Sequence, residues 1–260
     1  MSSVILSAQH VSKSFSVRQN ESVLALRDVS LDVYEHEFMC LLGASGCGKS
    51  TLLNMFAGFT APSQGDILLR SSPITGIDPR CGMMFQSYAL FPWRTVRKNV
   101  EFGPRMKGLP AAECRAIAGR FIEMVGLRGF ADHYPAELSG GMQQRATLAR
   151  SLAADPEVLL MDEPFAAVDA MTRHVLQEEL SRIQRESLKT VVLVTHNIDE
   201  ALIMADRIVV MSPHPGQIKA VITNDLARPR DIDVQLSRAW GALKKDVWSL
   251  VAGDVSLHAA

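Results

Sequence analysis

The sequence predicts an α/β fold with a mainly parallel sheet core, an N-terminal antiparallel β subdomain and an inserted helical subdomain. Apolar runs typical of buried parallel strands recur along the chain, at residues 38–42, 158–161 and 191–195. Before the first run, residues 4–6 and 24–33 alternate as antiparallel strands do. Residues 110–150 carry helical signals between the first run and the second, so a helical subdomain interrupts the sheet.

The remaining elements continue this rhythm of strands and helices. A helical pattern follows the first buried run at residues 52–59, and a polar-faced segment at residues 171–186 separates the last two. Further strands are predicted at residues 66–69, 82–85, 208–211 and 218–222, the last two as a hairpin across the turn SPHPGQ. We therefore expect one domain over residues 1–231, with the helical subdomain inserted at about residues 88–150, and a helical tail over residues 232–260.

The tail has an amphipathic pattern. Its apolar residues recur near helical spacing, at Leu236, Trp240, Leu243, Val247 and Val251. Such a helix either covers part of its own domain or contacts a partner or a membrane surface, and the pattern alone leaves both interpretations open.

Composition narrows the class of protein. With 260 residues, 47% of them hydrophobic, the chain can bury a sizeable core. The formal net charge of −1 gives no reason to expect a nucleic-acid partner. The four cysteines lack the spacing of a zinc site or of a disulfide scaffold, which favours a reducing compartment. We expect no secretory signal and no membrane span, because no apolar run approaches about 20 residues.

A glycine-rich loop follows the first buried strand. Residues 43–50 read GASGCGKS and satisfy the pattern G-x-x-x-x-G-K-[ST] between a predicted strand and a predicted helix. Backbone N–H groups of such a loop surround a β-phosphate, Lys49 bridges β- and γ-phosphate oxygens, and the Ser50 hydroxyl binds Mg²⁺. The residues assigned to phosphate binding are Gly43, Ala44, Ser45, Gly46, Cys47, Gly48, Lys49, Ser50 and Thr51.

Two carboxylates end the second buried run. In VLLMDE, Asp162 is assigned to the Mg²⁺ shell and Glu163 to polarising the attacking water as general base. Taken alone, two adjacent acids at a strand end could equally be a solvated cap. The glycine-rich loop elsewhere in the chain favours the catalytic interpretation.

Residues 138–145, LSGGMQQR, resemble the LSGGQ signature of the ABC ATPases. Ser139 can cap a helix, while Gly140 and Gly141 allow close backbone approach, so this signature segment forms a second anion cradle together with Gln143. The resemblance implies the ABC ATPase form of the P-loop NTPase fold. It also implies that the segment closes on ATP held by a second copy of the chain, in a head-to-tail pair.

Other family elements follow in the expected order. By resemblance, Phe15 stacks on adenine, with an ordinary core or surface phenylalanine as the alternative. Gln86 resembles the glutamine that contacts Mg²⁺ and the attacking water, and His196 the histidine that contacts the γ-phosphate. Asp169 resembles the aspartate that links two protomers, although the preceding residues, Ala166, Ala167 and Val168, lack the usual serine.

The type of ABC protein is indicated by what the chain contains. It has one set of motifs, and the segment LFPWRTVRKNV and the tail LARPRDIDV are similar to ATPases of the taurine, nitrate, sulfonate and bicarbonate importers. This resemblance implies ATP and Mg²⁺ as cofactors, a separate transmembrane permease, an external solute-binding protein, and a peripheral location on the cytoplasmic face of the membrane. Relatives that carry thiamine precursors, riboflavin or aromatic acids have similar sequences. Soluble ABC ATPases of repair or translation, and small-molecule kinases, are the other classes considered.

An aromatic segment, residues 88–93, follows Gln86 and reads YALFPW where a polar loop would be usual. In the family this neighbourhood receives a coupling helix of the permease. The alternative is packing of the helical subdomain on the sheet.

Overall fold

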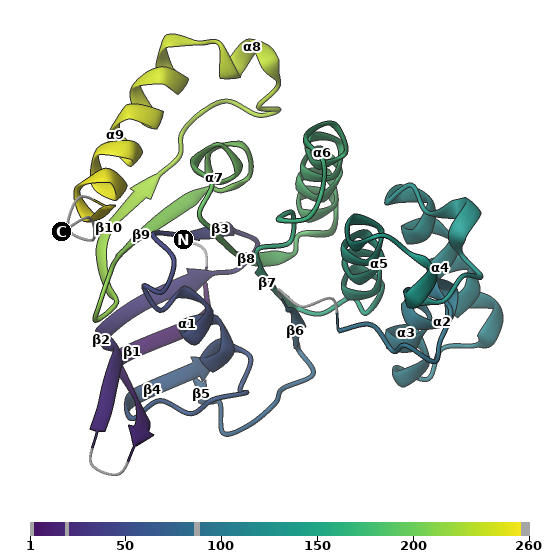
Figure 1. The fold of residues 1–260 in the computed structure, drawn as a ribbon, viewed down its shortest axis with the longest axis horizontal. Helices are drawn as coiled ribbons and strands as arrows, with labels where there is room; N and C mark the ends of the chain where they lie inside the picture. Colours follow the sequence, from purple (N-terminus) through teal and green to yellow (C-terminus); the bar gives the residue numbers. More distant parts are fainter. Residues whose placement is uncertain (1–2, 19–20, 86–88, 256–260) are drawn as a thin grey trace. The chain divides into compact units, whose positions relative to one another are not determined.

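A computed structural model describes residues 3–18, 21–85 and 89–255, and it divides the chain into two compact units (Figure 1). The first unit comprises residues 1–78 and 184–260, and the second comprises residues 79–183.

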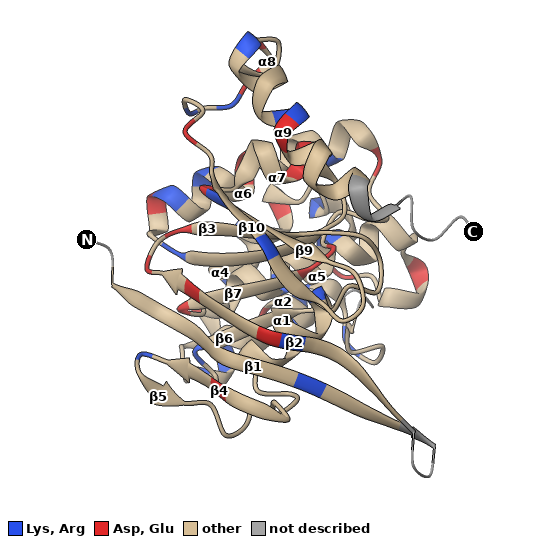
Figure 2. Ribbon diagram, turned by 90° about the vertical axis from the view of Figure 1, so that its left-hand side faces the viewer, with Lys and Arg blue, Asp and Glu red and all other residues tan. Residues whose placement is uncertain are grey.

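The first unit contains an antiparallel sheet in the order β2-β1-β4-β5. Its strands are β1 (Val4–Arg18), β2 (Glu21–Tyr34), β4 (Gln64–Leu69) and β5 (Ser72–Pro73). Strands β1 and β2 lie side by side as a long ribbon (Figure 2). Both are longer than predicted, since strands were expected only over residues 4–6 and 24–33. Polar side chains do not interrupt an antiparallel ladder, because its hydrogen bonds join backbone groups.

Four strands of the second sheet also belong to the first unit. Strands β3 (Phe38–Leu42), β8 (Thr190–Thr195) and β9 (Arg207–Ser212) are parallel, and β10 (Gln217–Thr223) pairs antiparallel with β9 as the predicted hairpin. In both β3 and β8 every residue is buried, as their uninterrupted apolar sequences predict. Strand β3 lies between β8 and β9, so the loop after β3 leaves the centre of this group.

Helices of the first unit follow the strands that position the candidate site. They are α1 (Lys49–Phe56), α7 (Ile198–Met204), α8 (Ile232–Gln235) and α9 (Arg238–Val255). The tail helix α9 begins at Arg238, so the prediction that Leu236 belongs to its apolar face is wrong; that side chain is 78% exposed. Trp240 and Val247 are buried, and α9 packs on α7 and β9 (Figure 1). The tail therefore covers its own domain.

The second unit combines two parallel strands with a group of helices. Strand β6 (Cys81–Met84) pairs with β7 (Val158–Asp162). The helices are α2 (Val96–Val100), α3 (Phe102–Met106), α4 (Ala111–Met124) and α5 (Gly140–Ala153), with short 3-10 turns at Arg128–Phe130 and Pro135–Glu137. Helix α6 (Ala170–Ser187) begins in this unit.

The core of the helical group lies around α5. Helices α2, α3 and α4 all pack against it. Its buried face includes Ala146, Leu148 and Ala149, and α4 contributes Ala118 and Phe121. Small alanine side chains allow helices to approach closely, so α5 is held firmly over its length. Its first turn carries the signature segment, whose position is therefore fixed by the packing of the whole helix.

Candidate active site

The glycine-rich loop joins β3 to α1 in the first unit. Gly46 and Gly48 have φ values of +79° and +93°, in the region that glycine adopts without strain. A Cβ on Gly48 would lie 2.5 Å from Cδ2 of Leu26 and 3.1 Å from the carbonyl oxygen of Ala25. Any side chain at Gly48 would therefore displace the loop from β2.

Lys49 supplies the positive charge of this loop. Its side chain is buried, and its Nζ donates to the carbonyl oxygens of Gly43 and Ala44, each at 2.8 Å. The first turn of α1 contains no acidic residue that would repel an anion. The N-terminus of this helix and the Lys49 ammonium group therefore both attract one. Ser50 and Thr51 follow on the same turn. Curled backbone, helix N-terminus and ammonium together form a cradle that fits a polyphosphate.

The loop is also supported from the β9 side. Because β3 and β9 are parallel, with Leu42 opposite Val210, the loop after β3 and the β9–β10 turn (residues 213–216) leave the same edge. A Cβ on Gly43 would lie 2.7 Å from the carbonyl oxygen of Met211. A Cβ on Gly46 would lie 3.5 Å from Nε2 of His214. The sequence predicts this turn as a hairpin connection but does not indicate its contact with the loop.

His196 follows β8 and is exposed. The residues on both sides of it are fixed by one hydroxyl group: Thr195 Oγ1 donates to Oε2 of Glu200 at 2.6 Å and accepts from the backbone N–H of Asn197 at 3.0 Å. The Asn197 side chain then caps α7 by accepting from the N–H groups of Asp199 and Glu200. The backbone at His196 is therefore held between a buried strand end and a capped helix.

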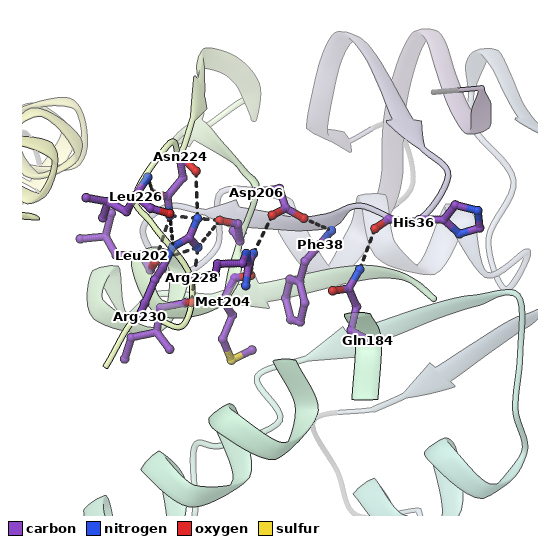
Figure 3. Close-up of polar contacts among 12 residues, drawn as sticks. His36, Phe38, Gln184, Leu202, Met204, Asp206, Asn224, Leu226, Arg228 and Arg230 are labelled. Carbon is purple, nitrogen blue, oxygen red and sulfur yellow. Dashed lines mark hydrogen bonds and ion pairs between the residues drawn. The ribbon is translucent and has the colours of Figure 1, made fainter. Parts of the chain in front are cut away.

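The other end of α7 is held by the chain that leads to the tail (Figure 3). Arg230 is buried and donates to the carbonyl oxygens of Leu202 and Ala205 at 3.1 and 2.6 Å. The Asn224 side chain donates to the same two oxygens. Burial lowers the pKa of Arg230 to about 10, so the guanidinium is still charged at neutral pH. Charged and amide donors thus satisfy carbonyls that a helix end leaves open.

An ion pair next to Arg230 joins this segment to the central strand. Arg228 donates to Oδ1 of Asp206 at 2.6 Å, while Oδ2 of Asp206 accepts from the backbone N–H of Phe38 at 2.9 Å (Figure 3). Phe38 is the first residue of β3, the strand that carries the glycine-rich loop. The arginine–proline segment LARPRDIDV (residues 226–234) thus anchors both α7 and β3, a role that its sequence did not indicate.

Phe15 lies on β1 and is 43% exposed. It pairs with Val23 across the ribbon, and Nζ of Lys13 lies 5.1 Å from its ring centre. An exposed ring on a strand is available for stacking, and the neighbouring ammonium adds a positive charge beside it.

The second unit holds the two carboxylates. Asp162 is the last residue of β7 and is buried. Glu163 follows with φ of +48°, an unusual backbone conformation for a residue with a side chain. Strain of this kind is kept only where surrounding contacts enforce it and is common at active sites. Gln86, the third residue predicted near these groups, lies outside the described residues.

The signature segment has the expected local form. Ser139 Oγ accepts from the N–H of Met142 at the start of α5. The Gln143 amide donates to the carbonyl oxygens of Pro135 and Leu138, so it ties the signature segment to the residues that precede it. A Cβ on Gly141 would lie 2.8 Å from the carbonyl oxygen of Ala167, which makes glycine necessary there. Backbone N–H groups at the N-terminus of this 14-residue helix can donate hydrogen bonds to an anion.

Residues 164–169 form the aspartate loop between β7 and α6. Asp169 is exposed and accepts from the N–H of Thr172, and this hydrogen bonding lowers the pKa of its carboxyl group. Its carboxylate therefore caps the first turn of α6 and remains ionised.

A family model described as ABC transporter matches residues 26–166. The chain belongs to this family. It is an ATPase cassette. Within the described part of the chain, none of the helices is both long and apolar enough to cross a membrane.

Known relatives agree with this assignment. An uncharacterized ABC transporter ATP-binding protein of Methanocaldococcus jannaschii is 51% identical over 88% of this chain and 85% of its own length. A taurine import ATP-binding protein of Roseobacter denitrificans is 48% identical over 82% of this chain and 80% of its own. A solved dimer of an ATP-binding cassette with ADP and Pi superimposes with a TM-score of 0.78 at 32% identity, covering 84% of this chain and 98% of the other. These matches confirm the predicted fold and family.

Proposed function

We propose that this chain is the ATP-hydrolysing subunit of an importer that takes up a small solute such as nitrate, taurine or another sulfonate through a separate permease. Its phosphate cradle, formed by the glycine-rich loop, Lys49 and the N-terminus of α1, is the observation that carries ATP binding. The solute class is supported by two relatives. One is the taurine import protein of Roseobacter denitrificans. The other is a nitrate import ATP-binding protein of Synechococcus elongatus, 46% identical over 88% of this chain and 35% of its own length.

The chemistry proposed is in-line attack of water on the γ-phosphorus of ATP. Lys49 neutralises charge on the β- and γ-phosphates, and Glu163 accepts a proton from the attacking water. His196 contacts the γ-phosphate, Gln86 orients the water, and Phe15 stacks on adenine. This transition state needs little covalent help, so positioning and charge supply most of the acceleration.

Magnesium fits the same residues. Bound Mg²⁺ would neutralise phosphate charge, with Ser50, Gln86 and Asp162 as its protein ligands. Among the residues that the structure describes, no three or more His, Cys, Asp or Glu side chains are grouped to hold a metal ion. Mg²⁺ takes few protein ligands beside substrate phosphates, so a hydroxyl and a buried carboxylate suit it.

We infer that two copies act head to tail. The glycine-rich loop lies in one compact unit, and the signature segment, a second anion-binding helix start, lies in the other. A second cradle serves the nucleotide of a partner: Ser139, Gly140 and Gly141 would close on ATP held by another copy, with Gln143 bracing them and Asp169 at the junction. The related solved cassettes are dimers.

The aromatic segment is proposed to receive the permease. Trp93 is 72% exposed, and Phe91 packs edge-on against Phe102 at 4.8 Å between ring centres. Buried Asn99 holds the segment by accepting from the N–H of Phe91 and donating to the carbonyls of Phe91 and Arg94. An exposed indole on a fixed loop is typical of a docking site.

The importer assignment defines the location and the remaining partners. The cassette would lie on the cytoplasmic face of the membrane, bound to the permease, with a solute-binding protein acting on the opposite face. We also propose that residues 1–231 form the cassette proper, with the helical subdomain inserted at about residues 88–150 and residues 232–260 as its tail.

Reconstitution tests this function. The cassette would be co-expressed with a permease of the taurine or nitrate importer type, placed in proteoliposomes and supplied with the matching solute-binding protein. Solute uptake that needs ATP on the cassette side, and that falls with Trp93→Ala while ATPase activity of the free cassette is kept, supports the proposal. Copurification with ribosomes or DNA instead of a polytopic membrane protein would contradict it.

A further inference from the structure

Gln144, in the first turns of α5, joins three elements of the second unit. Its side chain is buried at 3% exposure. Its amide nitrogen donates to the carbonyl oxygen of Glu163 at 3.0 Å, and its amide oxygen accepts from the N–H of Ala167 at 2.7 Å. One planar amide therefore connects the helix of the signature segment with the proposed general base and with the aspartate loop.

The bond to Glu163 acts at a residue whose backbone has a positive φ. A φ of +48° is unfavourable for a residue with a side chain, so surrounding contacts must offset its cost. The partly buried hydrogen bond from Gln144 to its carbonyl restrains the peptide that follows Glu163 and so limits rotation about its backbone. The direction of the Glu163 carboxylate depends on that backbone, because the side chain extends from the same Cα.

The bond to Ala167 acts at a second tight contact. Gly141 of the signature segment packs against Ala167 so closely that a Cβ would lie 2.8 Å from the carbonyl oxygen. The N–H of Ala167 donates to the Gln144 side chain. The carbonyl and the N–H of Ala167 therefore both contact the start of α5. The aspartate loop and the first turns of α5 cannot shift independently of each other.

Glutamine has the chemistry that this position requires. The carbonyl of Glu163 needs a donor and the N–H of Ala167 needs an acceptor, and a side-chain amide supplies one of each. A carboxylate would supply only acceptors, and a thioether of similar length would supply neither with comparable strength. Without Gln144 the carbonyl loses its shorter hydrogen bond and keeps the longer one from the N–H of Ala166, at 3.3 Å, so replacement should move the Glu163 backbone rather than leave it in place.

We propose that Gln144 is a positioning residue for ATP hydrolysis, which couples the signature segment to the Glu163 backbone and the aspartate loop so that the three move as one body. This inference rests on the proposed roles of Glu163 and the signature segment. In a head-to-tail pair, the signature segment of one copy engages the partner's nucleotide, while Glu163 of the same copy serves its own. When the signature segment closes on the partner's nucleotide, Gln144 then transmits that movement to Glu163, the base that acts on the copy's own nucleotide.

The test compares Gln144→Met and Gln144→Glu with wild type, using fluorescence titration of Mg-ATP binding and steady-state ATPase kinetics. Both variants should bind ATP within about twofold of wild type, because the side-chain hydrogen bonds of Gln144 lie within the second unit, whereas the glycine-rich loop belongs to the first. Turnover at saturating ATP should fall by about 10- to 100-fold, the range that misplacement of a catalytic group by about an ångström produces. Gln184→Met is the matched control, since the Gln184 amide is also buried and donates to two carbonyls, of His36 and Lys189.

The pH profile separates positioning from general stability. In Gln144→Glu the introduced carboxyl keeps the acceptor for Ala167 but donates to Glu163 only when protonated. Its turnover relative to wild type should therefore rise as pH falls, whereas Gln144→Met should show a constant ratio. Turnover within about twofold of wild type in both variants, or a flat ratio for Gln144→Glu, would overturn the inference.

Glu163→Gln is measured alongside. If Glu163→Gln keeps turnover, the proposed role of Glu163 fails, and the inference fails with it. If Glu163→Gln is inactive while the Gln144 variants are normal, only the inference fails. Melting temperatures without nucleotide show that each variant is folded under the assay conditions.

Discussion

The carbonyl oxygen of Cys47 occupies the space next to Gly216 so closely that a Cβ on this glycine would lie 2.1 Å away. Gly216 is fixed on its other side, where its N–H donates to the carbonyl of Ala25 and its own carbonyl accepts from the N–H of Arg27. The β9–β10 turn is thus clamped between β2 and the glycine-rich loop. The conformation of the loop depends on a residue more than 150 positions away in sequence.

Gly216→Ala should weaken nucleotide binding. The added methyl group has no room beside Cys47, so the loop must shift, and its N–H groups then lose alignment with the phosphates. We expect the dissociation constants of ATP and inorganic tripolyphosphate to rise about tenfold or more, measured by isothermal titration calorimetry.

The control for this variant is Gly241→Ala, because a Cβ on Gly241 in α9 meets no atom within 4 Å. It should bind tripolyphosphate like wild type. Equal affinities for Gly216→Ala and Gly241→Ala would show that the β9–β10 turn does not support the loop.

Glu163→Gln should preserve ATP binding and nearly abolish turnover. The amide keeps the size of the side chain but cannot accept a proton from water, so hydrolysis stops after the nucleotide has closed the pair. Size-exclusion chromatography with Mg-ATP should then show a trapped dimer. Turnover near wild type in the purified variant would remove Glu163 from the role of base.

Thr195→Val should lower turnover more than it lowers affinity. Valine keeps the shape but removes the hydroxyl that joins Glu200 to the N–H of Asn197, leaving a buried carboxyl without that donor. His196 then loses a fixed backbone on both sides. We expect the turnover number to fall by about tenfold with little change in the KM for ATP.

Thr195→Ser restores the hydroxyl and is the matching rescue variant. It should recover most of the turnover lost in Thr195→Val, in the same steady-state assay. If valine and serine behave alike, the hydroxyl does not position His196.

Sequence patterns predicted the parts of the fold that are local. Strand β3 could be recognised because its buried apolar run is continuous, and α5 because Ser139 precedes it as a cap. The break between α8 and α9 was missed, because Leu236 continues the apolar spacing of the tail although the chain leaves the helix there. Helical periodicity shows which residues could share a face, and does not show where the helix starts.

The contacts that position the candidate site are mostly long-range, and for that reason the sequence did not predict them. Gly216 meets Cys47 and Arg230 caps α7 only because the strands between them fold together. Gln144 stands directly after a recognised motif residue, yet nothing in its neighbourhood indicates that its amide would reach Glu163. The cap at Asn197 is a local contact, because an asparagine before an apolar helix is a common cap, but the sequence analysis did not assign it.

Arg230→Met should destabilise the folded cassette. The thioether fills much of the space of the guanidinium but leaves the carbonyls of Leu202 and Ala205 with one donor fewer each. Hydrogen bonds to charged donors contribute about 1.5–3 kcal/mol each, so we expect a loss of about 3 kcal/mol in the free energy of unfolding, measured by urea denaturation. Exposed Arg238→Met, at the start of α9, is the control and should change stability by less than about 0.5 kcal/mol.

Since α7 begins two residues after His196, Arg230→Met should also lower turnover at temperatures where the variant is still folded. Equal unfolding curves for the two variants would mean that Asn224 alone satisfies the end of α7 and that Arg230 is not an anchor.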